Sequence, residues 1–503
     1  MFKIADIFTD HKFLQREQNI KVFGKCDEQG EIKVEINGNS ATAKPIDGKW
    51  IAELPPMCAG GPYELSITFN DTKEVISDVL IGDVWIASGQ SNMEFPLIFE
   101  ARGLREAKYA YNPDVRLYTC SRSTYPGHTK KVWAFEKVSA DAVPWSVCDE
   151  RSALHFSAIG YYVAKLVQEQ TGIPIGVISA NVGGTPIDTF VPEEAFENEH
   201  YKPAMEAYNK IKVPDEEAGA YYDEWYKDYL KSIEDFGETK ENQIRQMGIA
   251  ATVIKGRSYI AAPLKMCKYH SCAPSVLYIM FIRDQIMPMA VKGVLWYQGE
   301  SSRFDRNYAD KFRILTEYWR EAFQNKDMPF YTVEIAPHNY REAVCHIAYL
   351  RAEQWRASDM DENVHIVSTQ DVGDKFDIHP YSKIEVSERL ANQMLNYTYG
   401  IEKYCESPSY SSHEIRGNEV WIKLRNAEGF FGDDISNNLL ICGEDDRYHK
   451  ASFKIDGDYL VVWKEGIDKP KNVRYCFADW YGRGGFFNRA GLPLAPFATD
   501  ISK

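Results

Sequence analysis

The sequence lacks several features, and each absence argues against a class of protein. No apolar run reaches the roughly 18 residues that a membrane-spanning helix needs. The first residues, MFKIADIFTDHKFLQREQ, have neither the basic start nor the apolar segment of a signal peptide. We therefore expect a cytoplasmic protein, or a secreted one if a leader has been removed. A net charge of −15 without long Lys/Arg clusters argues against nucleic acid as a partner.

The ten cysteines also lack a pattern. They form no CxxC pair and no repeated spacing, so we expect free thiols in a reducing compartment. The rest of the composition is that of an ordinary globular protein, with 44% hydrophobic and 26% charged residues. At 503 residues, about three domains are expected. Aromatic residues are frequent at 13%; they suit stacking on sugar rings, but they also fill β-sandwich cores.

Hydrophobic periodicity divides the chain into several parts. Residues 1–80 and 399–503 carry short alternating stretches separated by turn residues, which predicts an all-β, sandwich-like domain at each end. Residues 81–190 and 250–398 alternate apolar runs with helical patterns. Between them, 191–249 has two polar, aromatic-rich helical patterns and is interpreted as an inserted helical hairpin, either a wall of the substrate site or a surface decoration.

The middle part has five continuous apolar runs, each suited to one buried strand. Helical patterns separate them, and the clearest cover about 156–170 and 307–324. Buried strands with intervening helices predict an α/β fold with a five-stranded parallel, doubly wound sheet. The strands are expected at 84–87, 175–180, 293–297, 330–336 and 364–369.

The first polar signal is the segment SGQSNM (88–93), directly after the first of these strands. A serine in a tight loop at the carboxyl end of a parallel strand can present both its hydroxyl and its N–H to a ligand. Ser91 is therefore the candidate nucleophile, and Ser88 is a weaker one because it lies closer to the strand. The alternative is that Ser91 only caps the helix that follows.

The second signal is DIHP (377–380), after the fifth strand and before a helical pattern. A serine hydroxyl needs a base with a suitable pKa within hydrogen-bond reach, and an imidazole qualifies. His379 is the candidate base and Asp377 the candidate orienter. A structural histidine is the alternative, since DxH alone is weak, but the position at the same sheet edge as Ser91 favours catalysis.

Two glycine-containing loops, NVGGT (181–185) and YQGES (297–301), follow the second and third strands. Acyl transfer places negative charge on the carbonyl oxygen, which needs preorganised N–H donors. The N–H groups of Ser91 and of a loop glycine, with the Gln298 amide, could form this oxyanion hole. Each loop alone is also compatible with an ordinary turn.

In these segments the sequence resembles the sialate O-acetylesterase-like branch of the SGNH (GDSL-type) hydrolases, a group of carbohydrate esterases. The resemblance covers nearly the whole chain, notably VWIASGQSNMEFPL, IPIGVISANVGGTPID, VKGVLWYQGESS, DIHPYSKIEVSERLA and GLPLAPFATD. It implies a three-layer α/β/α domain flanked by β modules. The residue roles that it implies are Ser91 as nucleophile, His379 with Asp377 as base and orienter, and Gly184 (or Gly183) and Gln298 as oxyanion donors.

Some positions depart from the family pattern. Family members commonly have WGGTPIE where this chain has VGGTPID (182–188), and LYNGMI where it has LYIMFI (277–282). Both segments are expected to line the pocket, so the substrate is less well defined than the reaction. Further candidates for contacts to the substrate or to the catalytic side chains are Gln90, Asn92, Gly183 and Glu300.

A third departure concerns the orienter of the base. Many relatives have two acidic residues before IHP, whereas position 376 is Phe here, which leaves Asp377 as the immediate candidate. Asp371 and Asp374 are the alternatives, and a Ser-His dyad is another.

The sequence thus predicts a serine esterase that releases acetyl groups from acetylated oligosaccharides of plant type, such as manno- or xylo-oligosaccharides. We expect neither metal nor cofactor, and neither membrane nor nucleic-acid partner. O-acetylated sialic acid is the alternative substrate, although its carboxylate would be helped by an Arg that the sequence does not assign. A silent carbohydrate-binding protein is disfavoured because Ser91, Gln298 and His379 are all present. A lipase or thioesterase would need a longer apolar groove.

Overall fold

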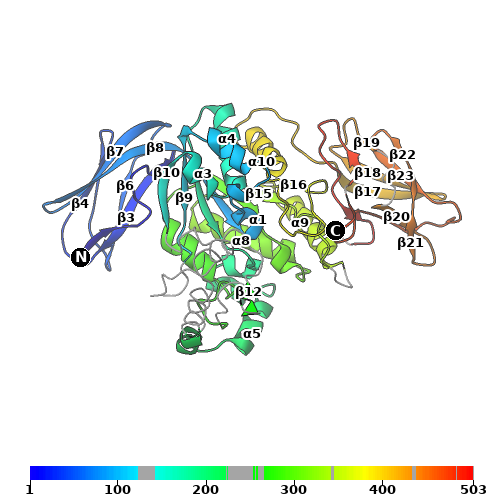
Figure 1. The fold of residues 1–503 in the computed structure, drawn as a ribbon, viewed down its shortest axis with the longest axis horizontal. Helices are drawn as coiled ribbons and strands as arrows, with labels where there is room; N and C mark the ends of the chain where they lie inside the picture. Colours follow the sequence, from blue (N-terminus) through cyan, green and yellow to red (C-terminus); the bar gives the residue numbers. More distant parts are fainter. Residues whose placement is uncertain are drawn as a thin grey trace.

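The computed structural model describes residues 1–122, 142–221, 224, 265–340, 345–432, 438–482 and 484–501, and the backbone of the short strands β12 (Val253–Ile254) and β13 (Arg257–Ser258). Within these residues, no helix combines the length and apolar character needed to cross a membrane. The chain is arranged as a row (Figure 1), with an N-terminal β part at one end, an α/β part in the middle and a C-terminal β part at the other end.

The N-terminal part consists of short strands with alternating burial. In β4 (Ile32–Ile36) and β6 (Lys49–Leu54) every second residue is buried, as expected when one face of a strand covers a core. The other strands are β1 (Phe2–Ile4), β2 (Phe13–Gln15), β3 (Ile20–Cys26), β5 (Asn39–Ala43) and β7 (Gly60–Phe69). Strands β1, β3 and β6 form a three-stranded sheet, whereas the others join the large sheet of the molecule.

The long strand β8 (Thr72–Gly89) connects the N-terminal part to the α/β part. Its first half pairs with β7 and β2, and its second half lies in the middle of the central sheet. One continuous hydrophobic core also covers both parts. The boundary predicted between residues 80 and 81 therefore falls inside a single strand, because residues 79–89 are buried without interruption.

The central sheet has the order β10-β9-β11-β8-β14-β15-β16. All five predicted strands are present, but the predicted number of parallel strands is wrong by one. Strand β9 also runs parallel to β11, and β10 adds an antiparallel edge. The bounds are β9 (Asn112–Thr119), β10 (Val143–Cys148), β11 (Ile175–Asn181), β14 (Gly293–Tyr297), β15 (Phe330–Val333) and β16 (Val364–Val367).

Strand β9 escaped prediction because its sequence, NPDVRLYT, contains no continuous apolar run. It begins with turn residues and places a charged side chain, Arg116, inside the sheet region. The Arg116 guanidinium is buried and pairs with Asp78 at 2.9 Å. The cost of burying that charge is offset by a partner that comes from β8.

The strand order places a topological switch at the end of β8. The neighbours of β8 are β11 on one side and β14 on the other, and both follow it in the chain. In doubly wound sheets, ligands bind in the crevice outside the carboxyl ends of the strands at such a switch point. The fold thus directs attention to the residues directly after Gly89.

Helices cover both faces of the sheet, as the complete burial of β11, β14 and β15 requires. Helices α4 (Ala158–Thr171) and α10 (Ile384–Tyr397) pack against each other, as do α8 (Tyr308–Ala322) and α9 (His346–Met360). Shorter elements are α1 (Ser91–Glu94), η1 (Leu97–Phe99), α2 (Gly103–Glu106), η2 (Ala107–Tyr109), α3 (Glu150–Leu154), η3 (Ile187–Phe190), η4 (Glu193–Glu197), the π-helix η5 (Tyr278–Ile286) and η6 (Glu300–Ser302).

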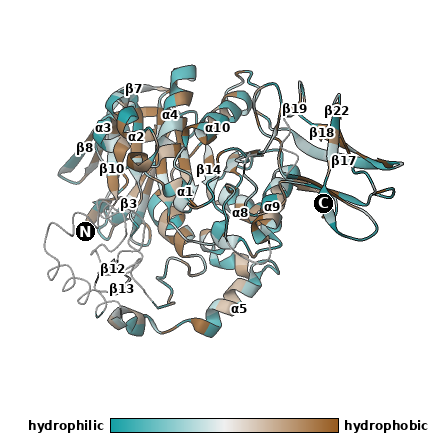
Figure 2. Cartoon of the chain, turned by 45° about the vertical axis from the view of Figure 1, so that its right-hand side comes forward, coloured by the Kyte–Doolittle hydropathy of each residue, from teal (hydrophilic) through white to brown (hydrophobic). Residues whose placement is uncertain are grey.

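The predicted hairpin at 191–249 lies only partly within the described residues. Its first helix is α5 (Lys202–Ile211), and a second helical segment covers 215–221. Most of the remaining hairpin, from residue 222 onward, falls outside the described residues. In both Figure 1 and Figure 2, α5 lies well away from α1, so the first helix does not form a wall beside Ser91.

The C-terminal part has its own hydrophobic core. One four-stranded sheet has the order β17-β18-β23-β22, and another has the order β21-β20-β24-β26. The bounds are β17 (Ser409–Arg416), β18 (Glu419–Arg425), β19 (Phe431–Gly432), β20 (Leu439–Cys442), β21 (Tyr448–Lys450), β22 (Ser452–Asp456), β23 (Tyr459–Trp463), β24 (Asn472–Tyr475), β25 (Phe486–Phe487) and β26 (Phe497–Ala498). The buried Arg351 of α9 donates to the backbone oxygens of Ala478 and Asp479 and so fastens this part to the middle one.

Candidate active site

Ser91 is the first residue of α1, directly beyond the end of β8. The turn between them needs a glycine, because Gly89 has a φ of +132° and a Cβ there would lie 2.2 Å from the Tyr297 carbonyl oxygen. Ser88 is fully buried, and its hydroxyl donates to Ala180 O at 2.7 Å. Ser88 therefore has a structural role, and Ser91 is the partly exposed serine of the loop.

His379 lies in the loop between β16 and α10, and its Nε2 is 2.8 Å from Ser91 Oγ. The two residues are 288 positions apart in the chain, and the sheet brings them together. Asp377 is on the other side of the ring, with Oδ1 3.4 Å from His379 Nδ1. The same Oδ1 accepts the backbone N–H of His379 at 2.8 Å, which fixes the loop between the two residues.

The alternative orienters have other partners. The Asp371 carboxylate binds the Arg389 guanidinium at 2.6 and 2.8 Å. Asp374 Oδ1 accepts the backbone N–H groups of Phe376 and Asp377, so it shapes the loop. Among the candidate carboxylates, Asp377 is the one placed beside the His379 ring.

The electrostatic surroundings keep His379 neutral over a wide pH range. Burial and, to a smaller extent, the positive charge of Lys383 lower the pKa of His379 from its ordinary value to about 4, while Asp377 acts in the opposite direction. An imidazole with that pKa is unprotonated at neutral pH and can accept the Ser91 proton.

The two glycines after β11 have different roles. The Gly183 N–H donates to Glu94 Oε2 at 2.6 Å, and a Cβ at Gly183 would lie only 3.2 Å from the Cβ of Ser91. Gly184 has a φ of +74° and faces open space. Among the described residues, neither the Gly184 N–H nor the Ser91 N–H has an acceptor. These two N–H groups are therefore the available oxyanion donors, and Gly183 is a structural residue.

The Gln298 amide, an oxyanion donor expected from sequence, already has other hydrogen-bond partners in the structure. Gln298 is fully buried, and its Nε2 lies 3.1 to 3.2 Å from Thr185 O, Ser302 Oγ and Gln90 Oε1. Its Oε1 accepts from the Tyr308 hydroxyl at 2.9 Å. Gln298 and Gln90 thus join the loops after β8, β11 and β14. The motif identified the residue type, but the direction of the side chain depends on these long-range contacts.

Two other candidates are also buried. Asn92 Nδ2 donates to Glu300 Oε1 at 2.6 Å, and Asn92 is 0% and Glu300 4% exposed. Burial raises the pKa of Glu300. Both side chains therefore lie behind the nucleophile and not on the surface that a substrate contacts.

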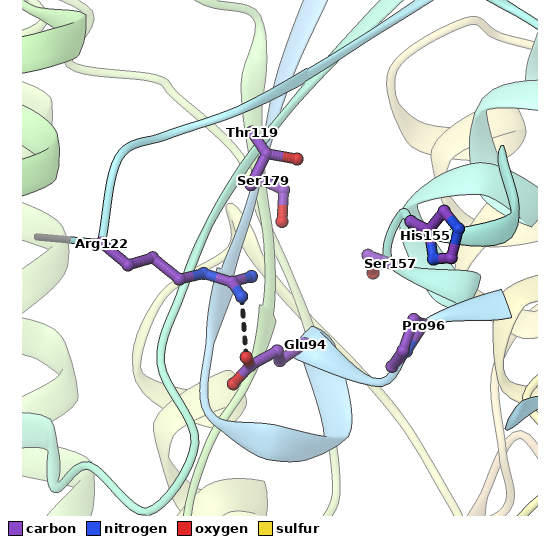
Figure 3. A pocket seen from close by; sticks show the side chains of 7 residues that line it. All are labelled: Glu94, Pro96, Thr119, Arg122, His155, Ser157 and Ser179. Carbon is purple, nitrogen blue, oxygen red and sulfur yellow. Dashed lines mark hydrogen bonds and ion pairs between the residues drawn. The ribbon is translucent and has the colours of Figure 1, made fainter. Parts of the chain in front are cut away.

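Sequence reasoning missed three charged side chains at the site: Glu94, Arg122 and Lys383. Glu94 accepts from Arg122 at 2.8 Å and from the Gly183 N–H, so it joins α1 to the glycine loop. Figure 3 shows this ion pair in a small polar pocket beside α1. Glu94 stands three residues after Ser91 in α1, and this helical spacing was the available signal for it, whereas Lys383 lies directly before α10 and had no such local signal. The pocket is lined by Glu94, Pro96, Thr119, Arg122, His155, Ser157 and Ser179.

Within the described residues, no group of three or more His, Cys, Asp or Glu side chains is arranged to hold a metal ion.

Comparisons with known proteins identify carbohydrate esterases as similar to this chain. Residues 264–396 match the family of carbohydrate esterases described as sialic acid-specific acetylesterases. The crystal structure of a carbohydrate acetylesterase from Xanthomonas citri superposes with a TM-score of 0.78 and 25% identity, covering 99% of this chain and 100% of that one. The chain is similar to the carbohydrate acetylesterases. The family resemblance seen in the sequence is thereby confirmed.

Sialate O-acetylesterases from mammals match a smaller share of this chain. The sialate O-acetylesterase of Rattus norvegicus is 26% identical over 357 residues, and that of Homo sapiens is 26% identical over 344 residues. Each alignment covers 64% of this chain. The chain spans 57% of the rat and 53% of the human protein, a little over half of their lengths.

The family match covers only part of the site. Its range includes Gln298, Glu300, Asp377 and His379, but it begins after Ser91. The link between the two halves of the site is therefore the 2.8 Å contact between Ser91 and His379.

Proposed function

We propose that this protein is a serine esterase that removes O-acetyl groups from carbohydrates. The observation that carries the proposal is the Ser91 hydroxyl 2.8 Å from the His379 Nε2, at the switch point of the sheet and beside two N–H groups without an acceptor among the described residues. The similarity to carbohydrate acetylesterases supports the same reaction.

The geometry supports a two-step mechanism. His379 Nε2 takes the Ser91 proton as Oγ attacks the acetyl carbonyl carbon, and the N–H groups of Ser91 and Gly184 bind the oxyanion. The C–O bond to the sugar breaks, and His379 gives its proton to the leaving alcohol. Water, deprotonated by His379, then attacks the acetyl-serine, and acetate and the free Ser91 hydroxyl result. Asp377 holds the ring orientation throughout.

For the substrate, we favour an acetylated oligosaccharide of plant type. Two exposed aromatic residues precede and follow the base in the sequence, Phe376 at 80% and Tyr381 at 53% exposure. Such flat, accessible rings suit stacking on sugar rings. Arg122, the guanidinium in the pocket beside α1, is neutralised by Glu94, which favours a sugar without a carboxylate.

O-acetylated sialic acid is the second candidate. It is favoured by the description of the matching family and by the names of the curated mammalian relatives. In that case the acid group of the substrate would compete with Glu94 for Arg122.

The test is acetate release by the wild-type protein from a substrate panel. It contains acetylated manno- and xylo-oligosaccharides, O-acetylated sialic acid and an aryl acetate as a minimal ester. Release from the sugars supports the proposal, and the preferred member identifies the substrate class. No release from any member, combined with measurable glycan binding, would instead support a silent carbohydrate-binding protein.

The dependence of the reaction on pH follows from the pKa of His379. A base acts when it is unprotonated, so kcat/KM should be at its plateau at neutral pH and fall only as the pH drops towards the value of about 4. The measurement is a pH–rate profile with the aryl acetate, accompanied by thermal unfolding at each pH to separate titration from loss of fold. An acidic limb near the ordinary histidine value of about 6.5 would contradict the prediction.

A further inference from the structure

A buried polar chain behind Ser91 and His379 takes no part in the mechanism described above. Its centre is Asn92, whose amide makes three hydrogen bonds. Nδ2 donates to Glu300 Oε1 at 2.6 Å and to Ile378 O at 3.1 Å, and Oδ1 accepts from Lys383 Nζ at 2.7 Å. Because Asn92 follows the nucleophile and Ile378 precedes the base, this one side chain joins the two catalytic segments.

Lys383 is an unusual residue to find in this position. It is 1% exposed, and among the described residues it forms no ion pair within 4.0 Å. Its ammonium group lies 4.7 Å from the centroid of the Phe95 ring, and that ring stacks on His379 at 6.3 Å. A buried charge is costly unless hydrogen bonds and charges compensate it, so its position against the ring that stacks on the base needs a reason.

Several charged groups face Lys383 and His379. Glu300 on η6, Glu100 after η1 and Asp377 all raise the pKa of Lys383, but burial is the larger effect and lowers it to about 7. His379 faces Lys383, Asp377 and His338, from the loop after β15, and the first and last of these disfavour its protonation. Lys383 is thus positively charged below about pH 7. The acidic limb of the pH–rate profile of a histidine base is measured in this pH range.

We propose that Lys383 is a positioning residue for the Ser91–His379 pair. Through Asn92 it holds α1 against the loop that carries the base, and its positive charge keeps His379 unprotonated until the Ser91 proton is transferred. The same charge makes the resulting imidazolium a stronger acid, which helps it to protonate the leaving alcohol. This inference rests on the esterase function proposed above.

The experiment compares variants that separate charge from packing. Lys383→Met removes the charge and the donor to Asn92 at similar length, Lys383→Arg keeps the charge, and Lys383→Gln is uncharged but keeps an N–H donor. Lys375→Met is the matched control, because it removes an exposed lysine four residues before His379. Each protein is measured for its kcat/KM against pH with the aryl acetate.

For Lys383→Met we expect a kcat/KM at pH 6 about 10²-fold lower, as small misplacements of catalytic groups cause. The acidic limb of the Lys383→Met pH–rate profile should move to higher pH. The acidic limb of Lys383→Gln should move in the same direction, even if that variant keeps part of the wild-type rate. Lys383→Arg and Lys375→Met should keep the wild-type limb. The proposal is overturned if Lys383→Met keeps both the wild-type rate and the wild-type acidic limb. It is also overturned if all the Lys383 variants lose rate without any shift of the acidic limb.

A second measurement separates this inference from the proposed function. NMR titration of ring-labelled histidine gives the pKa of His379 in the resting protein, without turnover. A higher pKa in Lys383→Met or Lys383→Gln than in the wild type supports the role of the charge, and an unchanged value overturns it. If the wild type hydrolyses no ester while the His379 pKa still rises in the variants, the proposed function fails and the electrostatic role of Lys383 stands.

Discussion

Replacement of Ser91 by Ala should lower kcat for acetate release by about 10⁴-fold or more. In the proposed mechanism the Ser91 hydroxyl oxygen attacks the acetyl carbon, and its contact with His379 at 2.8 Å has no substitute in the loop. The side chain is only partly buried and makes no other side-chain hydrogen bond among the described residues, so the melting temperature should stay close to that of the wild type. Stopped-flow or steady-state release of acetate from the aryl ester measures the change.

Ser88→Ala is the control for this experiment. Ser88 is three residues away in the same segment, but its hydroxyl donates to Ala180 O inside the sheet. Losing that hydrogen bond should cost roughly 1 kcal/mol of unfolding free energy and leave kcat within a few-fold of the wild type. If Ser91→Ala keeps a tenth of the wild-type kcat, Ser91 is not the nucleophile.

The loss of the base should be nearly as severe. In His379→Ala, Ser91 Oγ has no proton acceptor, and we expect a fall in kcat of roughly 10⁴- to 10⁶-fold. Because the nucleophile and its base act as a unit, Ser91→Ala/His379→Ala should be no slower than Ser91→Ala alone. Single-turnover kinetics with the aryl acetate check both statements, and additive losses in the double variant would contradict the shared role.

Asp377→Asn provides a graded comparison for the base. The Asp377 Oδ1 is 3.4 Å from His379 Nδ1, beyond a normal hydrogen bond, and the side chain is 35% exposed. Its loss should therefore lower kcat far less than the loss of His379 does. An equal loss in both variants would show a tightly coupled triad.

The sequence was sufficient to predict those strands that are apolar throughout. Strands β8, β11, β14, β15 and β16 were found because strands buried on both faces read as continuous hydrophobic runs. Strand β9 could not be found in this way, because Arg116 is stabilised by Asp78, a partner that the local sequence does not reveal. The end of the N-terminal part was placed inside β8 since composition changes there while the backbone continues.

The candidate site shows the same division between local and long-range information. Ser91 and His379 could be paired because each follows a parallel strand, and such strands end at the same edge of a sheet. The inward direction of Gln298 depends on acceptors from two other loops. The buried Lys383 is recognisable only once Asn92 is known to lie against it.

The continuity of β8 limits where this chain can be divided into separate parts. The strand begins among the N-terminal β-strands and ends two residues before the nucleophile, and one core is shared across it. A shortened chain that starts at residue 81 would lack the first half of β8, the strand that leads to Ser91. It would also lack the strands that pair with that half. The C-terminal part has a core of its own, so modular exchange between related esterases is feasible at that end of the molecule and not at the other.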